Sequence, residues 1–305
     1  MIKKLVEFNK KDEEGSIHEE NQYLNLVRDI IKENNIVCGR NGNALTTIGS
    51  VMHFDLTNMT IPIFTTKKVA WKTCAKELFW FISGSTSNTI LNKQNVNIWN
   101  DNASRDFLDS RGLSNLKEND LGPVYGHQWR HFNANYTDCN TNYFGKGKDQ
   151  LQYLINCLND PKERYSRRLI MSAWNPCQID EMALPPCHVL LHLNVVDEKL
   201  SGILYQRSGD LGLGVPFNIM SYSLLIHLLG YHCGLEVKEF IYYLGNTHIY
   251  DDHVESLKKQ LENKPYKFPT LKIVNKHNNI NDYSLNDIEI IDYKSHDSIK
   301  IKMRK

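Results

Sequence analysis

Hydrophobic residues recur with a helical period in several stretches of the chain. Residues 19–34 carry apolar side chains at three- and four-residue intervals, which predicts an amphipathic helix. The apolar positions of this stretch are Tyr23, Leu26, Val27, Ile30 and Ile31. Helices are also expected over 68–83 (with Gly84 as its stop), 149–158 and 248–263. The nearly continuous apolar run 217–233 predicts a buried core helix, since it is too short and too interrupted to span a bilayer.

Runs rich in β-branched and apolar residues predict strands between these helices. They are ALTTIGSVMHFDL (44–56), LIMSAW (169–174), HVLLHLNVV (188–196), KLSGILYQRS (199–208) and EFIYYLGN (239–246). The dipeptide at 197–198 separates two of these runs, so a hairpin with a two-residue turn is expected there. Counting outward from that turn places His188 opposite Arg207 and Cys187 opposite Ser208.

This register predicts a guanidinium beside the Cys187 thiol, a setting that lowers a cysteine pKa and makes a nucleophilic thiolate available. Pro185 and Pro186 stiffen the backbone before this cysteine, and His188 follows it. Spacing alone leaves a nucleophile and a buried structural thiol equally open. The other cysteines are expected to be small buried side chains; they are Cys38, Cys74, Cys139, Cys157, Cys177 and Cys233.

Glu77 interrupts an apolar stretch, KELFWF, in the helix expected over 68–83. Burial there would raise the pKa of the carboxyl and allow it to act as a general acid near neutral pH. The alternative is a glutamate at the edge of the apolar face, paired with a lysine.

Three further segments are candidates for ligand binding. Residues 95–132 are rich in turns, aromatic residues and charges, which is typical of binding loops. The glycines of QRSGDLGLGVPFNI (206–219) allow a ligand to approach the backbone closely. The adjacent Arg167 and Arg168 suit a dianion, although adjacent arginines that face solvent need no function, and the same is true of Arg40 in its loop.

Composition narrows the class of protein. The 305 residues contain no linker, repeat or low-complexity block, so we expect one domain, with residues 1–16 as a loose lead-in. A net charge of +1 argues against general nucleic-acid binding. Seven cysteines without a framework of close spacings indicate a reducing compartment, and no signal-peptide-like or membrane-length apolar run is present. A cytoplasmic location and no membrane association are therefore expected.

Eight motifs, taken in order along the chain, resemble those of the thymidylate synthase family. They are TTKKVAWK, ELFWFISGST, IWNDNASRDFLDSRG, DLGPVYGHQWRHF, SRRLIMSAWNP, MALPPCH, YQRSGDLGLGVPFNI and HIYDDHVESLKKQL. The resemblance runs from about Leu24 to Met303. It implies an α+β fold, with a large curved mixed sheet packed with helices and a sheet face that forms a homodimer interface. It also implies a single catalytic domain over 1–305, in which residues 296–305 form a lid.

The implied reaction is the reductive methylation of dUMP to dTMP. The one-carbon and hydride donor would be 5,10-methylenetetrahydrofolate, which leaves as dihydrofolate, and no metal is implied. C5 of uracil becomes nucleophilic once a thiolate adds at C6, a step that the resemblance assigns to Cys187. Glu77 would be the general acid/base, and Tyr125 would serve the proton transfer at C5. Asn218 would select uracil over cytosine because its amide can donate to O4 and accept from N3–H.

The resemblance assigns the site residues to three groups. Catalytic residues are Cys187, Glu77, Tyr125, His188, Arg207, Asp210 and Asn218. Substrate-binding residues are Arg40, Arg167, Arg168, Gln206, Arg207, Ser208, Asn218, His248 and Tyr250, with Tyr222 as a further sugar contact. Folate-binding residues are Ile98, Trp99, Asp210, Gly214 and Phe217. Arg167 and Arg168 would reach into the active site of the neighbouring subunit.

Three positions depart from the family pattern: the shortened arginine loop GRNGNAL, Asn246 in place of a common aspartate, and the final MRK. Two other functions remain open. One is a pyrimidine-nucleotide hydroxymethylase on the same fold, in which water traps the methylene intermediate; Asn218 argues against its dCMP form. The other is a non-catalytic homologue, and RNA binding as a secondary role stays open. A Cys–His hydrolase would need an orienting residue and an oxyanion site, and the sequence indicates neither.

Overall fold

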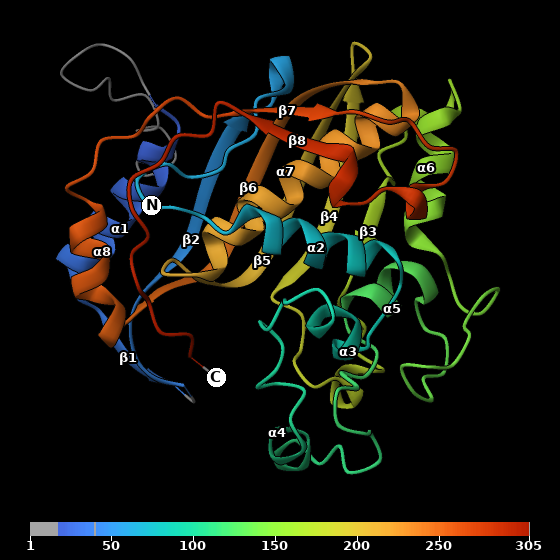
Figure 1. Cartoon of the computed structure of the whole chain (residues 1–305), viewed down its shortest axis with the longest axis horizontal. Coiled ribbons are helices and arrows are strands. Elements are labelled where there is room, and N and C mark those ends of the chain that lie inside the picture. Colours follow the sequence, from blue (N-terminus) through green and yellow to red (C-terminus); the bar gives the residue numbers. More distant parts are fainter. Residues whose placement is uncertain (1–17, 40, 305) are drawn as a thin grey trace.

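The computed structural model describes residues 18–39 and 41–304 (Figure 1). The α-helices are α1 (Glu20–Glu33), α2 (Trp71–Ile82), α3 (Asn88–Asn92), α4 (Arg105–Ser110), α5 (Tyr125–His131), α6 (Gln150–Asn159), α7 (Gly214–Cys233) and α8 (Val254–Gln260). The strands are β1 (Ile36–Gly39), β2 (Gly42–Asp55), β3 (Ile170–Ser172), β4 (His188–Val196), β5 (Lys199–Asp210), β6 (Glu236–Tyr250), β7 (Thr270–Ile273) and β8 (Ile288–Ile291). The expected lead-in 1–16 and Arg40 lie outside the described residues.

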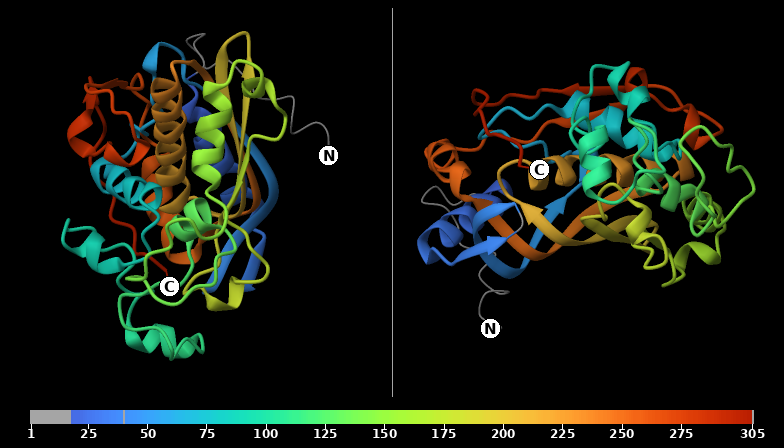
Figure 2. Two further views of the ribbon diagram at one scale, coloured as in Figure 1. Left: turned by 90° about the vertical axis from the view of Figure 1, so that its right-hand side faces the viewer. Right: turned by 90° about the horizontal axis from the view of Figure 1, so that it is seen from below.

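A six-stranded sheet with the order β1-β2-β6-β5-β4-β3 organises the fold. β5 and β6 run parallel and the other neighbouring pairs run antiparallel, so the sheet is mixed, as predicted. Its strands curve strongly, and helix α7 lies along one face (Figure 2). β7 and β8 form a separate two-stranded sheet.

Helix α7 is the centre of the core, which explains its nearly continuous apolar sequence. It packs against β5 and β6 on one side and against α2 on the other. The prediction of a buried helix is confirmed, and the helix begins one turn earlier, at Gly214. Pro216 is compatible with this start because the first-turn N–H groups of a helix have no partner within the helix. Gly234, with φ of 71°, ends it. No helix in the described part of the chain is both long and apolar enough to cross a membrane.

The last helix is shorter than predicted. The expected span 248–263 includes His248 and Tyr250, which instead end strand β6, and α8 begins only at Val254. His248 pairs with Thr46 of β2 on one side and with Asp210 of β5 on the other. Hydrogen bonding to two neighbouring strands therefore outweighs the local helical pattern.

The hairpin turn is confirmed, but its register is not. Both turn residues have positive φ (50° and 58°), as in a two-residue type I′ turn. A β-bulge between His188 and Leu190 then shifts the pairing by one, so that His188 lies opposite Gln206 instead of Arg207. The extra residue belongs to β4, and the Arg207 N–H consequently donates to the Cys187 carbonyl at 2.9 Å. Arg207 thus lies beside Cys187 itself.

A buried carboxylate, which the sequence analysis did not identify, fixes α1 to the rest of the fold. Glu20 is fully buried (0% exposed). Its oxygens accept hydrogen bonds from the backbone N–H and the hydroxyl of both Thr65 and Thr66. Four donors from one segment therefore converge on one side chain, which compensates for burying its charge.

We expect Glu20→Ala to lower the free energy of unfolding by about 3 kcal/mol, because the buried donors of Thr65 and Thr66 lose their shared acceptor and only the Thr65 hydroxyl has another one, the Tyr266 carbonyl at 3.3 Å. Chemical denaturation monitored by circular dichroism measures the loss. Asp29→Ala, at an exposed position of the same helix, is the matched control. A loss below about 1 kcal/mol for Glu20→Ala would show that water or neighbouring groups replace the carboxylate.

Candidate active site

Cys187 lies immediately before β4 and is half-buried. Its backbone N–H donates to the hydroxyl of Tyr125, the first residue of α5, at 2.8 Å. Its carbonyl accepts the Arg207 N–H from β5. Two elements that are distant in sequence thus hold the backbone of this residue on both sides.

The Arg207 side chain is anchored against the two prolines. Its Nε and Nη2 donate to the carbonyls of Pro186 (2.8 Å) and Pro185 (3.0 Å), and the guanidinium lies over the Trp174 ring. The expected lowering of the cysteine pKa is nevertheless wrong for the protein without ligand. Burial raises the pKa of Cys187 above its ordinary value, and the positive charge of Arg207 offsets only part of that rise. Removal from water therefore outweighs the neighbouring cation.

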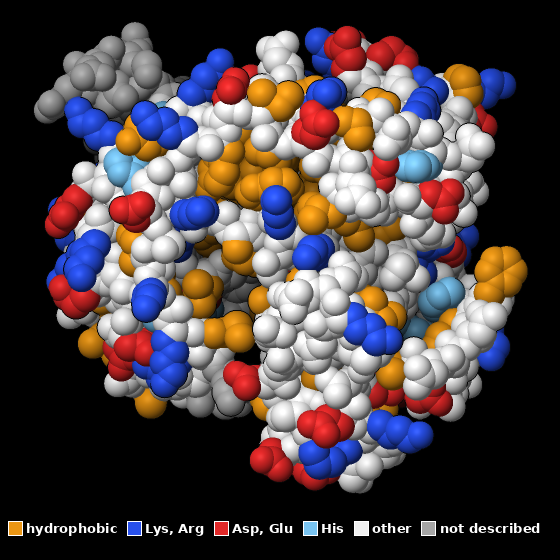
Figure 3. Space-filling model, viewed as in Figure 1, with side chains coloured by type: hydrophobic (Ala, Val, Ile, Leu, Met, Phe, Trp, Pro, Cys, Tyr) orange, Lys and Arg blue, Asp and Glu red, His pale blue; other side chains and the backbone are white. Residues whose placement is uncertain are grey.

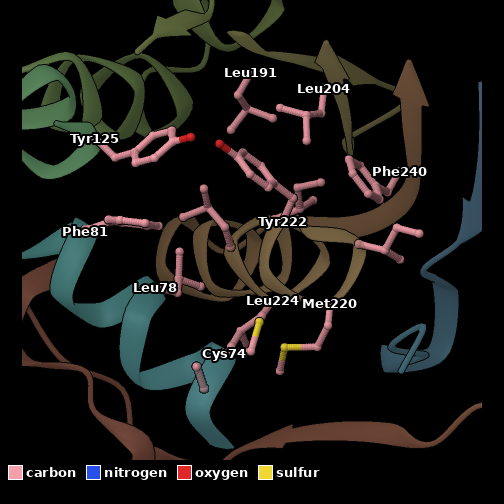
Figure 4. Packing of buried hydrophobic residues seen from close by; sticks show 14 of the residues in the cluster. Cys74, Leu78, Phe81, Tyr125, Leu191, Leu204, Met220, Tyr222, Leu224 and Phe240 are labelled. Atoms are coloured by element: carbon pink, nitrogen blue, oxygen red, sulfur yellow. The ribbon is translucent and has the colours of Figure 1, made fainter. Parts of the chain in front are cut away.

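His188 belongs to a buried aromatic cluster beside Cys187. Its ring stacks on Tyr125 at 3.9 Å between centroids, and its Nδ1 is 2.7 Å from the Tyr222 hydroxyl. Burial lowers the pKa of His188 to about 3, so the ring is neutral near pH 7 and unsuited to act as a cationic acid. The Tyr125 and Tyr222 hydroxyls point toward each other from α5 and α7 (Figure 4).

Glu77 projects from α2 toward the same cluster. The Trp99 indole N–H donates to its carboxylate at 2.7 Å, and the Trp99 ring is 6.3 Å from the Tyr125 ring. Burial raises the pKa of Glu77 to about 7, although the Trp99 hydrogen bond acts in the opposite direction. The raised pKa predicted from the apolar sequence context is confirmed. A carboxyl poised near neutrality can both give and take a proton.

A polar cavity of about 230 Å³ lies where β5, β6 and the β1–β2 turn meet. Its polar side chains come from Asn41, Thr46, Ser208, Asn246, His248 and Tyr250. The register explains this grouping, since Ser208 pairs with Asn246 and Thr46 with His248. His248 is held in place by its Nδ1, which is 2.9 Å from the Asn246 side-chain oxygen.

Gln206, which is predicted to bind substrate, makes hydrogen bonds within the protein through its side-chain amide. Its amide is buried, with its oxygen accepting from the Tyr242 hydroxyl at 2.6 Å and its nitrogen donating to the Ser208 carbonyl at 2.8 Å. Both ends of the amide are thus used within the protein, where they fix the strand that presents Ser208.

The first turn of α7 lies beside the end of β5. Asn218 is half-buried, and no described residue hydrogen-bonds to its amide. A Cβ added to Gly214 would approach only Asn218 Oδ1 (3.8 Å) and Asp210 Cβ (4.0 Å). Asp210 Oδ1 accepts the Gly212 N–H at 2.8 Å, which leaves Oδ2 without a hydrogen bond from the described part of the chain. Gly214 therefore lies between an amide and a carboxylate oxygen, neither of which accepts a hydrogen bond from the described residues.

The residues expected to form an apolar wall for the folate are partly or nearly buried. Trp99 is nearly buried, and Ile98 and Phe217 are partly buried and pack against the core. The molecular surface is hollowed between the part that carries α4 and the part that carries the C-terminal segment (Figure 3).

Arg167 and Arg168 are exposed and are not brought to Cys187 within this chain. They precede β3, the edge strand, and Arg168 Nε is 3.5 Å from the Ser166 hydroxyl. Arg40, which was expected to bind phosphate, lies outside the described residues.

Two further residues support the site, and neither is predictable from the sequence pattern. Trp174 underlies the Arg207 guanidinium. His253 is fully buried, and its Nδ1 is 3.4 Å from Asp210 Oδ1. A histidine within a polar run and a tryptophan at a strand end carry no local pattern that would have distinguished them. Among residues 18–39 and 41–304, no group of three or more potential ligands is arranged to hold a metal ion.

Comparison with known proteins gives the site its context. A family model described as thymidylate synthase matches residues 21–305. A bifunctional dihydrofolate reductase-thymidylate synthase of Paramecium tetraurelia is 47% identical over 287 residues, covering 94% of this chain and 61% of that protein. The protein of the same name from Plasmodium berghei is 49% identical over 288 residues, covering 94% and 48%. A probable thymidylate synthase of Schizosaccharomyces pombe is 45% identical over 297 residues, covering 93% and 47%.

The chain thus spans about half the length of the curated relatives it matches. The family match itself extends over nearly all of this chain and includes Cys187 and the residues grouped around it. The chain belongs to the thymidylate synthase family.

Proposed function

We propose that the protein methylates dUMP to dTMP, using 5,10-methylenetetrahydrofolate as the one-carbon and hydride donor. The observation that carries this proposal is the placement of Cys187. Its backbone is fixed between Tyr125 and Arg207, and Glu77, with a pKa of about 7, belongs to the same aromatic cluster. A thiol, a cation and a proton donor are the groups that covalent activation of a pyrimidine needs.

In the proposed first step, the Cys187 sulfur forms a bond to C6 of uracil while the C5–C6 π electrons move to C5 and the conjugated carbonyl. The thiol proton would pass to solvent water before the bond forms, and the raised pKa of Cys187 opposes this loss in the protein without ligand. Glu77 would supply a proton toward the O4 side through water, and Tyr125 would serve the removal of the C5 proton after the new carbon bond has formed. His188, being neutral, would orient Tyr222 and the base.

Arg207 and Ser208, together with Arg40 and the partner subunit's Arg167 and Arg168, would bind the nucleotide phosphate. The planar guanidinium matches phosphate oxygens in a bidentate manner. His248 and Tyr250 line the polar cavity and would bind the sugar. The side-chain amide of Asn218 would donate to O4 and accept from N3–H of uracil. Cytosine presents the reverse pattern of donor and acceptor at these positions, so the site would discriminate against it.

The residues around Gly214 fit a folate. A flat heterocycle with N–H donors needs an apolar wall and an acceptor; Trp99, Ile98 and Phe217 offer the wall and Asp210 Oδ2 the acceptor. When bound, the folate would supply the one-carbon unit and the hydride. Trp99 would exclude water at that stage, and its near-complete burial favours methylation over trapping by water.

The free face of the sheet supports a homodimer. Tyr205 and Tyr243 are 45% and 41% exposed and are neighbours across β5 and β6. Large apolar side chains that are exposed on a sheet face mark a surface for association. We therefore propose that two copies pair through this face. Each chain would form a single catalytic domain. The seven free cysteines fit a reducing compartment such as the cytoplasm.

The test is to mix the purified protein with dUMP and 5,10-methylenetetrahydrofolate, follow dihydrofolate by absorbance, and identify the nucleotide by mass spectrometry. Dihydrofolate and dTMP formed together, and only with dUMP, would support the proposal. A hydroxymethylated nucleotide without dihydrofolate would establish the hydroxymethylase instead. If neither product forms, both reactions are contradicted.

A further inference from the structure

The C-terminal segment has no regular secondary structure after β8, yet it is held against the molecule at several points. The Ser256 hydroxyl donates to the Lys300 carbonyl at 3.2 Å, and the buried His253 Nε2 is 2.7 Å from the Lys302 carbonyl. Ile301 packs against the core. These contacts bring Arg304 to the end of β6, beside residues that line the polar cavity.

Arg304 lies between two carboxylates. Its Nη2 is 2.7 Å from Asp251 and its Nε is 3.0 Å from Asp252. Both aspartates follow directly after β6, in a short 3-10 turn. One cation thus faces two anions. The buried His253 also lies near them, with its Nε2 3.7 Å from Asp252.

The same guanidinium also touches the rim of the cavity. It lies 5.7 Å from the centre of the Tyr250 ring, and its Nη1 is 3.5 Å from the Asn41 carbonyl. The position of a Cβ on Gly42 would be only 3.1 Å from Nη1. Tyr250, Asn41 and Gly42 all line the cavity. Arg304 therefore connects the end of β6, the β1–β2 turn and the C-terminal segment.

We propose that Arg304 is a positioning residue: its ion pairs with Asp251 and Asp252 strap the C-terminal segment across the rim of the cavity and neutralise those carboxylates beside the nucleotide site. The second part rests on the proposed function, because it concerns the binding of a phosphate-bearing substrate. The first part concerns only the free protein. Exposed ion pairs are individually weak and are screened by salt, so the strap is expected to respond to ionic strength.

The strap is tested in the free protein by limited trypsin digestion, with cleavage after Lys300 and Lys302 followed by mass spectrometry. We expect roughly three- to tenfold faster cleavage in Arg304→Ala and in the double variant Asp251→Asn/Asp252→Asn. Lys258→Ala is the matched control, because Lys258 forms a nearby exposed ion pair with Glu255 that does not touch the cavity, and its cleavage should equal that of the wild type. Unchanged cleavage in both strap variants would overturn the strap.

The charge effect is tested by steady-state kinetics at low ionic strength. Arg304→Ala is expected to raise KM for dUMP roughly three- to tenfold while kcat changes less than about twofold, since the two carboxylates beside the cavity then lose the Arg304 counter-charge and repel a phosphate. Adding Asp251→Asn and Asp252→Asn should return KM toward the wild-type value, although cleavage stays fast. At about 1 M salt the KM difference should disappear. If the triple variant keeps the high KM, neutralisation is refuted. If wild-type protein shows no turnover, the proposed function fails and the digestion alone decides the strap.

Discussion

Cys187→Ala is expected to abolish turnover, lowering kcat by about 10⁴-fold or more, because no other group in the site can form the bond to C6. The side chain is half-buried and small, so the fold should tolerate the change. The measurement is dihydrofolate formation under saturating substrates, combined with intact-mass analysis of the protein after quenching with acid. The wild type should carry a nucleotide adduct that the variant lacks.

The control for this prediction is Cys177→Ala, since Cys177 is an exposed cysteine only ten positions away. It should retain both turnover and the adduct. If Cys187→Ala still releases dihydrofolate within about tenfold of the wild-type rate, the thiol is not the nucleophile. The site would then have to bind and activate the pyrimidine without a covalent bond.

Glu77→Gln is expected to lower kcat/KM by about 10²- to 10⁴-fold, the range in which a positioned acid or base contributes. The amide oxygen can still accept the Trp99 N–H, so the loss would reflect proton transfer more than geometry. In the wild type the protonated carboxyl is the donor and its pKa is about 7, so activity should fall as pH rises through about 7. The variant should lose that limb of the pH profile.

The pH dependence of the free energy of unfolding tests the raised pKa of Glu77 independently. The pKa of Glu77 is raised in the fold from 4.5 to about 7, so the folded state binds this proton more tightly than the unfolded chain. The corresponding stabilisation is fully present below about pH 4.5 and is lost as pH rises through about 7. Denaturation midpoints of the wild type should therefore fall relative to those of Glu77→Gln across this window. Parallel curves for the two proteins would contradict the raised pKa.

The sequence predicted the elements that local periodicity controls. Helix α1, helix α7, both hairpin strands and the turn between them follow from apolar spacing and from a short turn, since neighbours within each segment decide these features. The raised pKa of Glu77 was predictable for the same reason, because the apolar residues that surround it lie next to it in the chain.

The features that were missed depend on contacts between distant segments. The bulge beside Cys187 lies where the Val189 carbonyl accepts the Ala173 N–H from the segment that follows β3, and strict alternation along β4 does not reveal an extra residue. Glu20 looks like a surface charge at a helix start, yet its partners Thr65 and Thr66 come from a segment more than 40 residues away. Burial by the whole fold reversed the expected direction of the Cys187 pKa.

Transfer of a hydride from the folate to the nucleotide is the central claim, and isotope transfer tests it most directly. The protein is supplied with dUMP and 5,10-methylenetetrahydrofolate that carries deuterium at the position of the donated hydride, and the product nucleotide is analysed by mass spectrometry. The account predicts dTMP with one deuterium in its new methyl group, formed in equal amount with dihydrofolate. A hydroxymethylated product, or dTMP without the label, would contradict it.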